Sequence, residues 1–119
     1  MINFYVIMGH YEYEDNSKIL GVHTGLSSAI RQLNEIKHDQ DLFYNHSTNC
    51  RTYYDYYTLD IVIMQPDKEN NCFTTHSVHE YIEVFFGCTT KVNYISNGRI
   101  IKKVILEDGE NIVIGADGG

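Results

Sequence analysis

The stretch Arg51–Gln65 most constrains the fold, because it indicates a long β-strand that is apolar or aromatic on both sides. Successive side chains of a strand point to opposite faces of its sheet. One face would carry Tyr53, Tyr57, Leu59, Ile61 and Ile63, and the other Tyr54, Tyr56, Thr58, Val62 and Met64. Two apolar faces are typical of a strand inside a sheet rather than of an exposed edge. The sequence therefore predicts a sheet with this strand near its centre.

The residues before this strand predict a hairpin, a helix and a loop. Apolar and polar residues alternate over Met1–Thr24 around a polar turn at Glu14–Ser17, which is typical of a β-hairpin. One apolar stripe then recurs at helical spacing, formed by Leu26, Ala29, Ile30, Leu33 and Ile36. Gln32 lies off this stripe, so we expect it to face water. The polar stretch His38–Thr52 predicts a long loop.

The residues after the strand predict a second helix and a second hairpin. Residues 65–71 hold the only proline and form a break that is too short to prove a domain boundary. Ser77–Glu80 fits a capping box, which favours a helix ending at Gly87. The rival interpretation makes Tyr81–Phe86 a strand, and we expect the helix. Asn97-Gly98 is a strong turn signal between strands over 91–96 and 99–107.

This order of elements predicts an α+β fold. The expected architecture is a mostly antiparallel sheet with two helices packed on one face, because the apolar stripe of the first helix must be buried against the sheet. A chain of 119 residues has room for one domain, so we expect a single α+β domain over 1–119, with 65–71 as the only place for a subdivision.

Composition excludes several classes of function. The net charge is −7, from 9 basic and 16 acidic residues, with no basic stripe interleaved with aromatic residues, so we expect no direct binding of nucleic acid. No apolar run reaches the roughly 18 residues of a membrane span. The first residues lack the basic n-region of a secretory signal. Three widely spaced cysteines fit a reducing compartment, so we expect a cytoplasmic protein.

The best ligand-like group for a metal is His76, His79 and Glu83. On a helix beginning at Ser77, His79 and Glu83 would lie one turn apart, and zinc accepts two imidazole nitrogens and a carboxylate. The spacing matches no dedicated zinc motif. Histidines near a helix cap beside surface carboxylates are the commoner explanation.

Two further candidates are weighed against structural roles. None of Cys50, Cys72 and Cys88 lies in a motif that activates a thiol, so burial as a small hydrophobic residue is the expected role. Asp60 interrupts an apolar run, and an inward carboxylate would have a raised pKa and could act as an acid or base. The commoner roles of such a residue are to mark a sheet edge, to bond a partner or to block strand-on-strand aggregation. It could also form an acidic group with Glu12 and Asp55 on neighbouring strands.

The tyrosines are the most plausible contact residues, because tyrosine buries a large ring while its hydroxyl finds a polar partner. We expect some of Tyr53, Tyr54, Tyr56 and Tyr57 to reach the surface and bind. No glycine-rich phosphate loop and no coherent catalytic set are present in the sequence, so no cofactor is expected. The favoured hypothesis is a non-enzymatic protein-binding module that contacts a protein partner or a second copy through a tyrosine-rich sheet face and an acidic surface. The alternative is a small metal-dependent hydrolase that uses His76, His79 and Glu83.

The first 65 residues carry a hydrophobic pattern that resembles a known group of proteins. Tyr5, Gly9 and Tyr11 lie in the first strand, Ile19–Thr24 follows, and a helix containing Ala29 leads into the tyrosine-bearing strand. This pattern resembles small uncharacterised proteins of phages and large DNA viruses. The resemblance implies a viral accessory or virion protein acting in the host cytoplasm or in the virion, and it carries over no catalytic residue.

Overall fold

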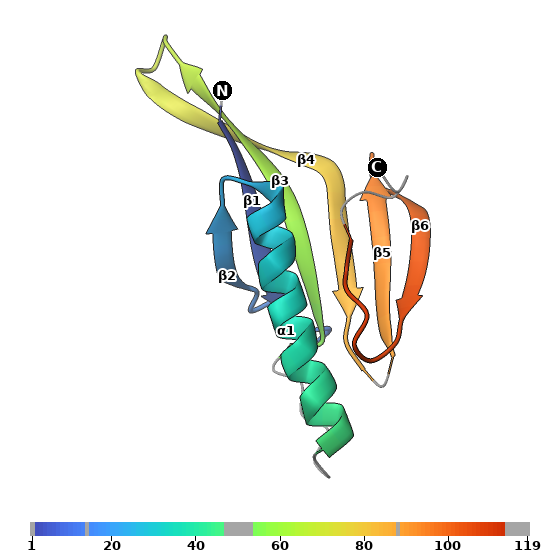
Figure 1. Cartoon of the computed structure of the whole chain (residues 1–119). Helices are drawn as coiled ribbons and strands as arrows, with labels where there is room; N and C mark the ends of the chain where they lie inside the picture. Colours follow the sequence, from blue (N-terminus) through green and yellow to red (C-terminus); the bar gives the residue numbers. More distant parts are fainter. Residues whose placement is uncertain (1, 14, 47–53, 88, 114–119) are drawn as a thin grey trace.

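The computed structural model describes residues 2–13, 15–46, 54–87 and 89–113, with 42–46 and 76–81 described as backbone. In this part of the chain, six strands and one helix follow one another as β1, β2, α1, β3, β4, β5 and β6 (Figure 1). Their bounds are β1 Ile2–His10, β2 Lys18–His23, α1 Leu26–His46, β3 Tyr56–Asp67, β4 Cys72–Phe85, β5 Thr90–Ser96 and β6 Arg99–Leu106.

The strands form one antiparallel sheet in the order β2-β1-β3-β4-β5-β6. The predicted mostly antiparallel sheet is thus confirmed, and β3 lies in its interior as expected. Both predicted hairpins are confirmed as β1–β2 and β5–β6. Asn97 and Gly98 both have positive φ, at 53° and 76°, as a tight hairpin turn requires. Residues 65–71 end β3 and turn into β4, so one sheet includes both halves of the chain.

The helix is longer than its apolar stripe indicated. It runs to His46, so the loop predicted from His38 is wrong as far as His46, and residues 47–52 lie outside the described part. The stripe itself is confirmed, because Ala29, Ile30 and Leu33 are buried, and Leu26 and Ile36 pack against the core. The described helix is too polar to cross a bilayer.

The second predicted helix is wrong, because the segment around Ser77–Glu80 belongs to β4. The capping-box pattern is a local signal worth about 1 kcal/mol, whereas this backbone pairs with β3 and, further along, with β5. The valine, isoleucine, tyrosine and phenylalanine residues that follow also favour a strand. Ile82, Val84 and Phe86 are buried while Glu83 and Phe85 are half-buried, which is the alternation of a strand.

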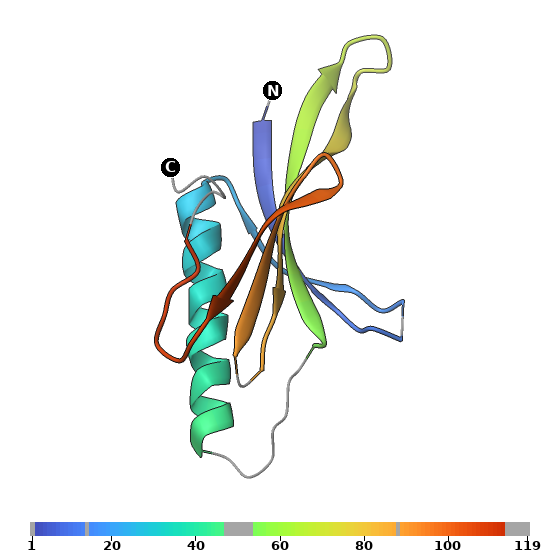
Figure 2. The same cartoon turned by 90° about the vertical axis from the view of Figure 1, so that its right-hand side faces the viewer.

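In the described part of the chain, a single helix therefore covers the sheet, and the C-terminal segment 107–113 lies beside it on the same face (Figures 1 and 2). Ile112 is fully buried in the core, and the Tyr94 hydroxyl donates a hydrogen bond to the Val113 carbonyl at 3.0 Å. This segment covers the β5 side of the sheet on the face where two helices were expected. Among the described residues, no element lies over the opposite face (Figure 2).

The core lies between α1, the C-terminal segment and one face of the sheet. Its buried apolar residues are Ile7, Ala29, Ile30, Leu33, Tyr57, Leu59, Ile82, Val84, Phe86, Val92, Tyr94, Leu106 and Ile112. Since β1 and β3 contribute only odd-numbered residues, their even-numbered side chains point away from α1. That alternation positions the candidate site.

Candidate functional site

The side chains of β1, β2 and β3 that point away from the helix form an uncovered apolar surface, which we call the open face. The register aligns Val6 with Val22 and Met8 with Ile19, so these residues share one side of the sheet. The apolar residues of the open face are Ile2, Phe4, Val6, Met8, Ile19, Val22, Val62 and Met64, and the carboxylate of Asp60 lies among them opposite Val6. None of these eight belongs to the core cluster or packs against it.

Three residues of the open face are exposed although they are large and apolar. Ile2, Ile19 and Val22 keep 47%, 63% and 55% of their surface accessible, and the other five are half-buried by their neighbours. Single exposed apolar side chains are ordinary, but a contiguous apolar surface marks an interaction site. The open face is therefore the candidate binding surface.

A polar centre borders the open face where β1 and β3 meet. His10 lies with Nε2 2.7 Å from the Thr58 hydroxyl oxygen and Nδ1 2.7 Å from that of Ser17. The His10 ring also stacks on Tyr56, with 4.7 Å between centroids, and Tyr56 stacks on Phe85 at 5.4 Å. These contacts fix the imidazole between two hydroxyl groups and an aromatic pair.

Two carboxylates influence this imidazole. Burial lowers the pKa of His10, and the negative charges of Asp60 and Glu83 oppose that shift. Burial also raises the pKa of Asp60, which His10 partly offsets. The raised pKa expected for Asp60 is thus confirmed in direction. Glu83 accepts a hydrogen bond from Asn93 Nδ2 at 3.1 Å.

The geometry of this polar centre differs from that of a catalytic triad. In a catalytic triad, a third group orients the histidine through one ring nitrogen while the other nitrogen faces the nucleophile. Both ring nitrogens of His10 form hydrogen bonds with hydroxyl groups. Asp60 interacts with the ring electrostatically and not through a hydrogen bond. The contacts therefore favour a role in holding β1, β3 and the turn at Ser17 together.

The four candidate tyrosines do not share one surface. Tyr57 is buried at 2% exposure, and Tyr54 packs on it edge-on with 5.5 Å between centroids. The Tyr54 ring also lies over Gly9, where an added Cβ would come within 2.5 Å of the ring. Tyr56 alone borders the open face, and Tyr53 lies outside the described residues.

The candidate metal ligands His76, His79 and Glu83 lie on a strand and not on the helix that was expected to group them. His76 and His79 lie on β4, and their side chains are outside the described part. Glu83 also lies on β4, where it is opposite Thr58 of β3. A strand rises about 3.3 Å per residue, so positions four apart in it are far more distant than on a helix. Among the described residues, no three potential ligands cluster.

The remaining candidates are placed as follows. Cys72 is exposed, so its expected burial is wrong, and Cys50 and Cys88 lie outside the described residues. Asp55 accepts a hydrogen bond from the Glu12 backbone N–H at 2.6 Å, which links two members of the predicted acidic group. Asp60 lies opposite Val6, several positions further along β1, so it does not join them.

Gln32 does not face water as expected. Its amide N–H donates to the Leu20 carbonyl, and its Oε1 bonds the His23 ring. Gln32 and His23 line a hollow of about 320 Å³ together with Ser28, Arg31 and Glu35. The hollow opens to solvent, and its polar groups serve to attach α1 to β2.

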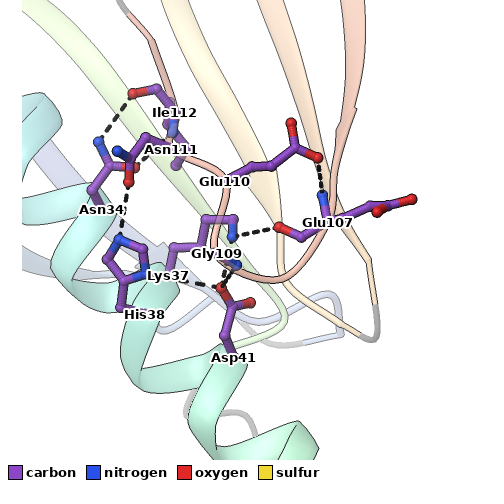
Figure 3. A network of polar contacts seen from close by, with 9 residues as sticks. All are labelled: Asn34, Lys37, His38, Asp41, Glu107, Gly109, Glu110, Asn111 and Ile112. Atoms are coloured by element: carbon purple, nitrogen blue, oxygen red, sulfur yellow. Dashed lines mark hydrogen bonds and ion pairs between the residues drawn. The ribbon is translucent and has the colours of Figure 1, made fainter.

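The most extensive polar network joins α1 to the C-terminal segment (Figure 3). Lys37 is fully buried, and its Nζ donates to Asp41 Oδ2 at 2.7 Å and to the Glu107 carbonyl at 3.0 Å. Asp41 also accepts from the Gly109 N–H at 3.3 Å. Asn34 Nδ2 donates to the Ile112 carbonyl, and its Oδ1 accepts from the Ile112 N–H. These bonds fix the segment over the core.

Sequence reasoning missed His10 and Lys37. The partners of His10 include Thr58, 48 residues away, and Lys37 meets Glu107 across 70 residues. The one available signal was Lys37 with Asp41 at i and i+4, a spacing that also occurs on ordinary exposed helix faces.

Comparisons with protein-family models, with curated proteins and with solved structures return no match.

Proposed function

We propose that this protein is a protein-binding module that docks through its open face, and that its partner is a second copy of the chain. The observation that carries the proposal is the apolar surface of β2, β1 and β3 on the side away from α1. Burial of apolar surface contributes roughly 25 cal/mol per Å², so covering this face favours association. The viral setting that the resemblance implied stays a prediction.

Charge supports a second copy as the partner. The chain has a net charge of −7, which disfavours contact between most of its surfaces in two copies. The eight apolar residues of the open face carry no charge, and the acidic side chain that lies among them, Asp60 opposite Val6, is half-buried, so two copies bring these faces together with few opposed charges. Face-to-face packing of two sheets is a common arrangement in proteins.

The site geometry shifts the expected contacts from tyrosine to aliphatic residues. Tyr56 remains as a bordering aromatic residue, while Tyr54 and Tyr57 serve the core side. The hydrolase alternative gains no supporting observation, because the helix that grouped His79 with Glu83 is replaced by β4.

The test is light scattering coupled to size-exclusion chromatography over a range of protein concentrations. The variant Val22→Glu adds a charge to the open face. The matched control Val113→Glu adds the same charge on the C-terminal segment, where Val113 has the same 55% exposure. We expect wild type and Val113→Glu to dimerise and Val22→Glu to be a folded monomer, because an unpaired charge in an interface is costly to desolvate. Wild type that stays monomeric, or Val22→Glu that still dimerises, contradicts the proposal.

A further inference from the structure

The strand β6 ends the sheet, and one of its edges is unpaired within the described part of the chain. It pairs with β5 on one side and is the last strand of the order β2-β1-β3-β4-β5-β6. The C-terminal segment turns back over β5 on the helix side, and Figure 1 shows the outer edge of β6 uncovered by any described element. An exposed strand edge presents backbone N–H and C=O groups that can pair with a further strand.

The charge around this edge is opposite to that of the whole protein. The segment Thr90–Leu106 carries Lys91, Arg99, Lys102 and Lys103 and no acidic residue, within a chain of net charge −7. The ion pairs found among the described residues involve none of these four cations. The hairpin β5–β6 is therefore a basic surface whose cations have no ion-pair partner among the described residues.

The lysines of β6 flank its edge on both faces of the sheet. Lys102 stands opposite Tyr94, whose ring is in the core, and Lys103 stands opposite Asn93, in the row of Glu83 and Thr58 on the other side. An added strand would meet a positive charge on each of its faces. Ile101 and Ile105, both exposed, supply apolar contacts along the same strand.

We propose that β6 binds an extended acidic segment of a partner protein, which adds to the sheet as a further strand. Backbone hydrogen bonds give such strand addition its affinity, and side-chain contacts select the sequence. Here the selecting contacts are two adjacent carboxylates opposite Lys102 and Lys103, with apolar side chains toward Ile101 and Ile105.

The same charges disfavour a second copy at this edge. Antiparallel pairing of two β6 strands about a two-fold axis at Lys102 or at Lys103 would set that lysine against its counterpart in the second copy, and directly opposed like charges destabilise strand pairs. Lysines at a sheet edge deter indiscriminate pairing. A strand bearing carboxylates converts that repulsion into attraction. This inference uses a different surface from the open face, so either proposal can fail without the other.

The test uses a fluorescein-labelled eight-residue peptide of alternating valine and threonine with two adjacent glutamates at its centre, titrated with the full chain and followed by fluorescence anisotropy. We expect saturable binding that weakens with added salt. Amide hydrogen exchange should show new protection confined to β6. The variant Lys102→Gln with Lys103→Gln should bind at least about tenfold more weakly, because it removes the opposed charges. The control Lys18→Gln with Lys68→Gln removes the same charge elsewhere and should bind like wild type.

A second peptide separates strand addition from simple charge attraction. It keeps both glutamates and carries N-methyl groups on alternate amides. Two versions are made, one methylated at the even positions and one at the odd positions, so that one version blocks the N–H groups that face the β6 edge. We expect the blocking version to lose binding. Equal binding of all versions, equal binding by the Lys102/Lys103 variant, or no saturable binding overturns the proposal.

Discussion

The buried Lys37 offers a sharp test of the packing between α1 and the C-terminal segment. In Lys37→Met the apolar stem is replaced at similar length, while the ammonium group that donates to Asp41 and to the Glu107 carbonyl is removed. Asp41 then loses its buried cation and keeps the Gly109 N–H as a hydrogen-bond donor at 3.3 Å and the exposed His38 ring at 4.0 Å. Removing one partner of a buried ion pair typically costs about 3–5 kcal/mol.

We expect a cost near the lower end, about 3 kcal/mol, because the Gly109 N–H still serves the Asp41 carboxylate. Domains of this size have a free energy of unfolding of about 5–15 kcal/mol, so the variant loses a large share of its stability. Urea unfolding followed by circular dichroism measures the difference as a shift in the midpoint, at unchanged slope.

Two variants make this prediction specific. Lys91→Met removes an exposed lysine and should cost less than about 0.5 kcal/mol. Lys37→Met combined with Asp41→Asn removes the orphaned charge and should be more stable than Lys37→Met alone. If Lys37→Met costs no more than Lys91→Met, or if the double variant is no more stable than the single one, the ion pair does not have the buried role assigned to it.

Two further predictions concern the core and the polar centre. Leu33→Ala should lower the free energy of unfolding in urea by about 2–5 kcal/mol, because Leu33 is fully buried under the sheet. Glu35→Ala, on the exposed side of the helix, should lower it by less than about 0.5 kcal/mol. Similar costs for the two variants would show that the helix face is misassigned. Asp60→Asn should lower the pKa of His10 further, measured by NMR titration of the ring protons, because the carboxylate opposes the lowering by burial. Since the pKa of His10 in the folded state is already below its unfolded value of about 6.5, the unfolded state binds the proton first, and stability falls as pH drops below that value. An unchanged or higher His10 pKa in Asp60→Asn would contradict this electrostatic link.

Features set by neighbouring residues were predictable from the sequence. The stripe from Leu26 to Ile36 specified a buried helix face, because side chains three and four apart share one side of any α-helix. Asn97 and Gly98 specified the β5–β6 turn, because both tolerate the positive φ that the turn requires. Asp60 also showed its unusual environment, as a carboxyl group inside an apolar strand.

Other features were decided only when distant segments met. The segment around Ser77 carries a helix-start signal, yet it pairs with β3 and leads into the pairing with β5, so the tertiary pairing determined its conformation. Lys37 has the pattern of a surface residue until the C-terminal segment folds over it. The open face likewise depends on which side of the sheet α1 covers. The sequence determined the apolar periodicity of α1 and the turn between β5 and β6. The tertiary structure decided the conformation of the segment around Ser77 and which faces are buried, because both depend on contacts between residues far apart in the chain.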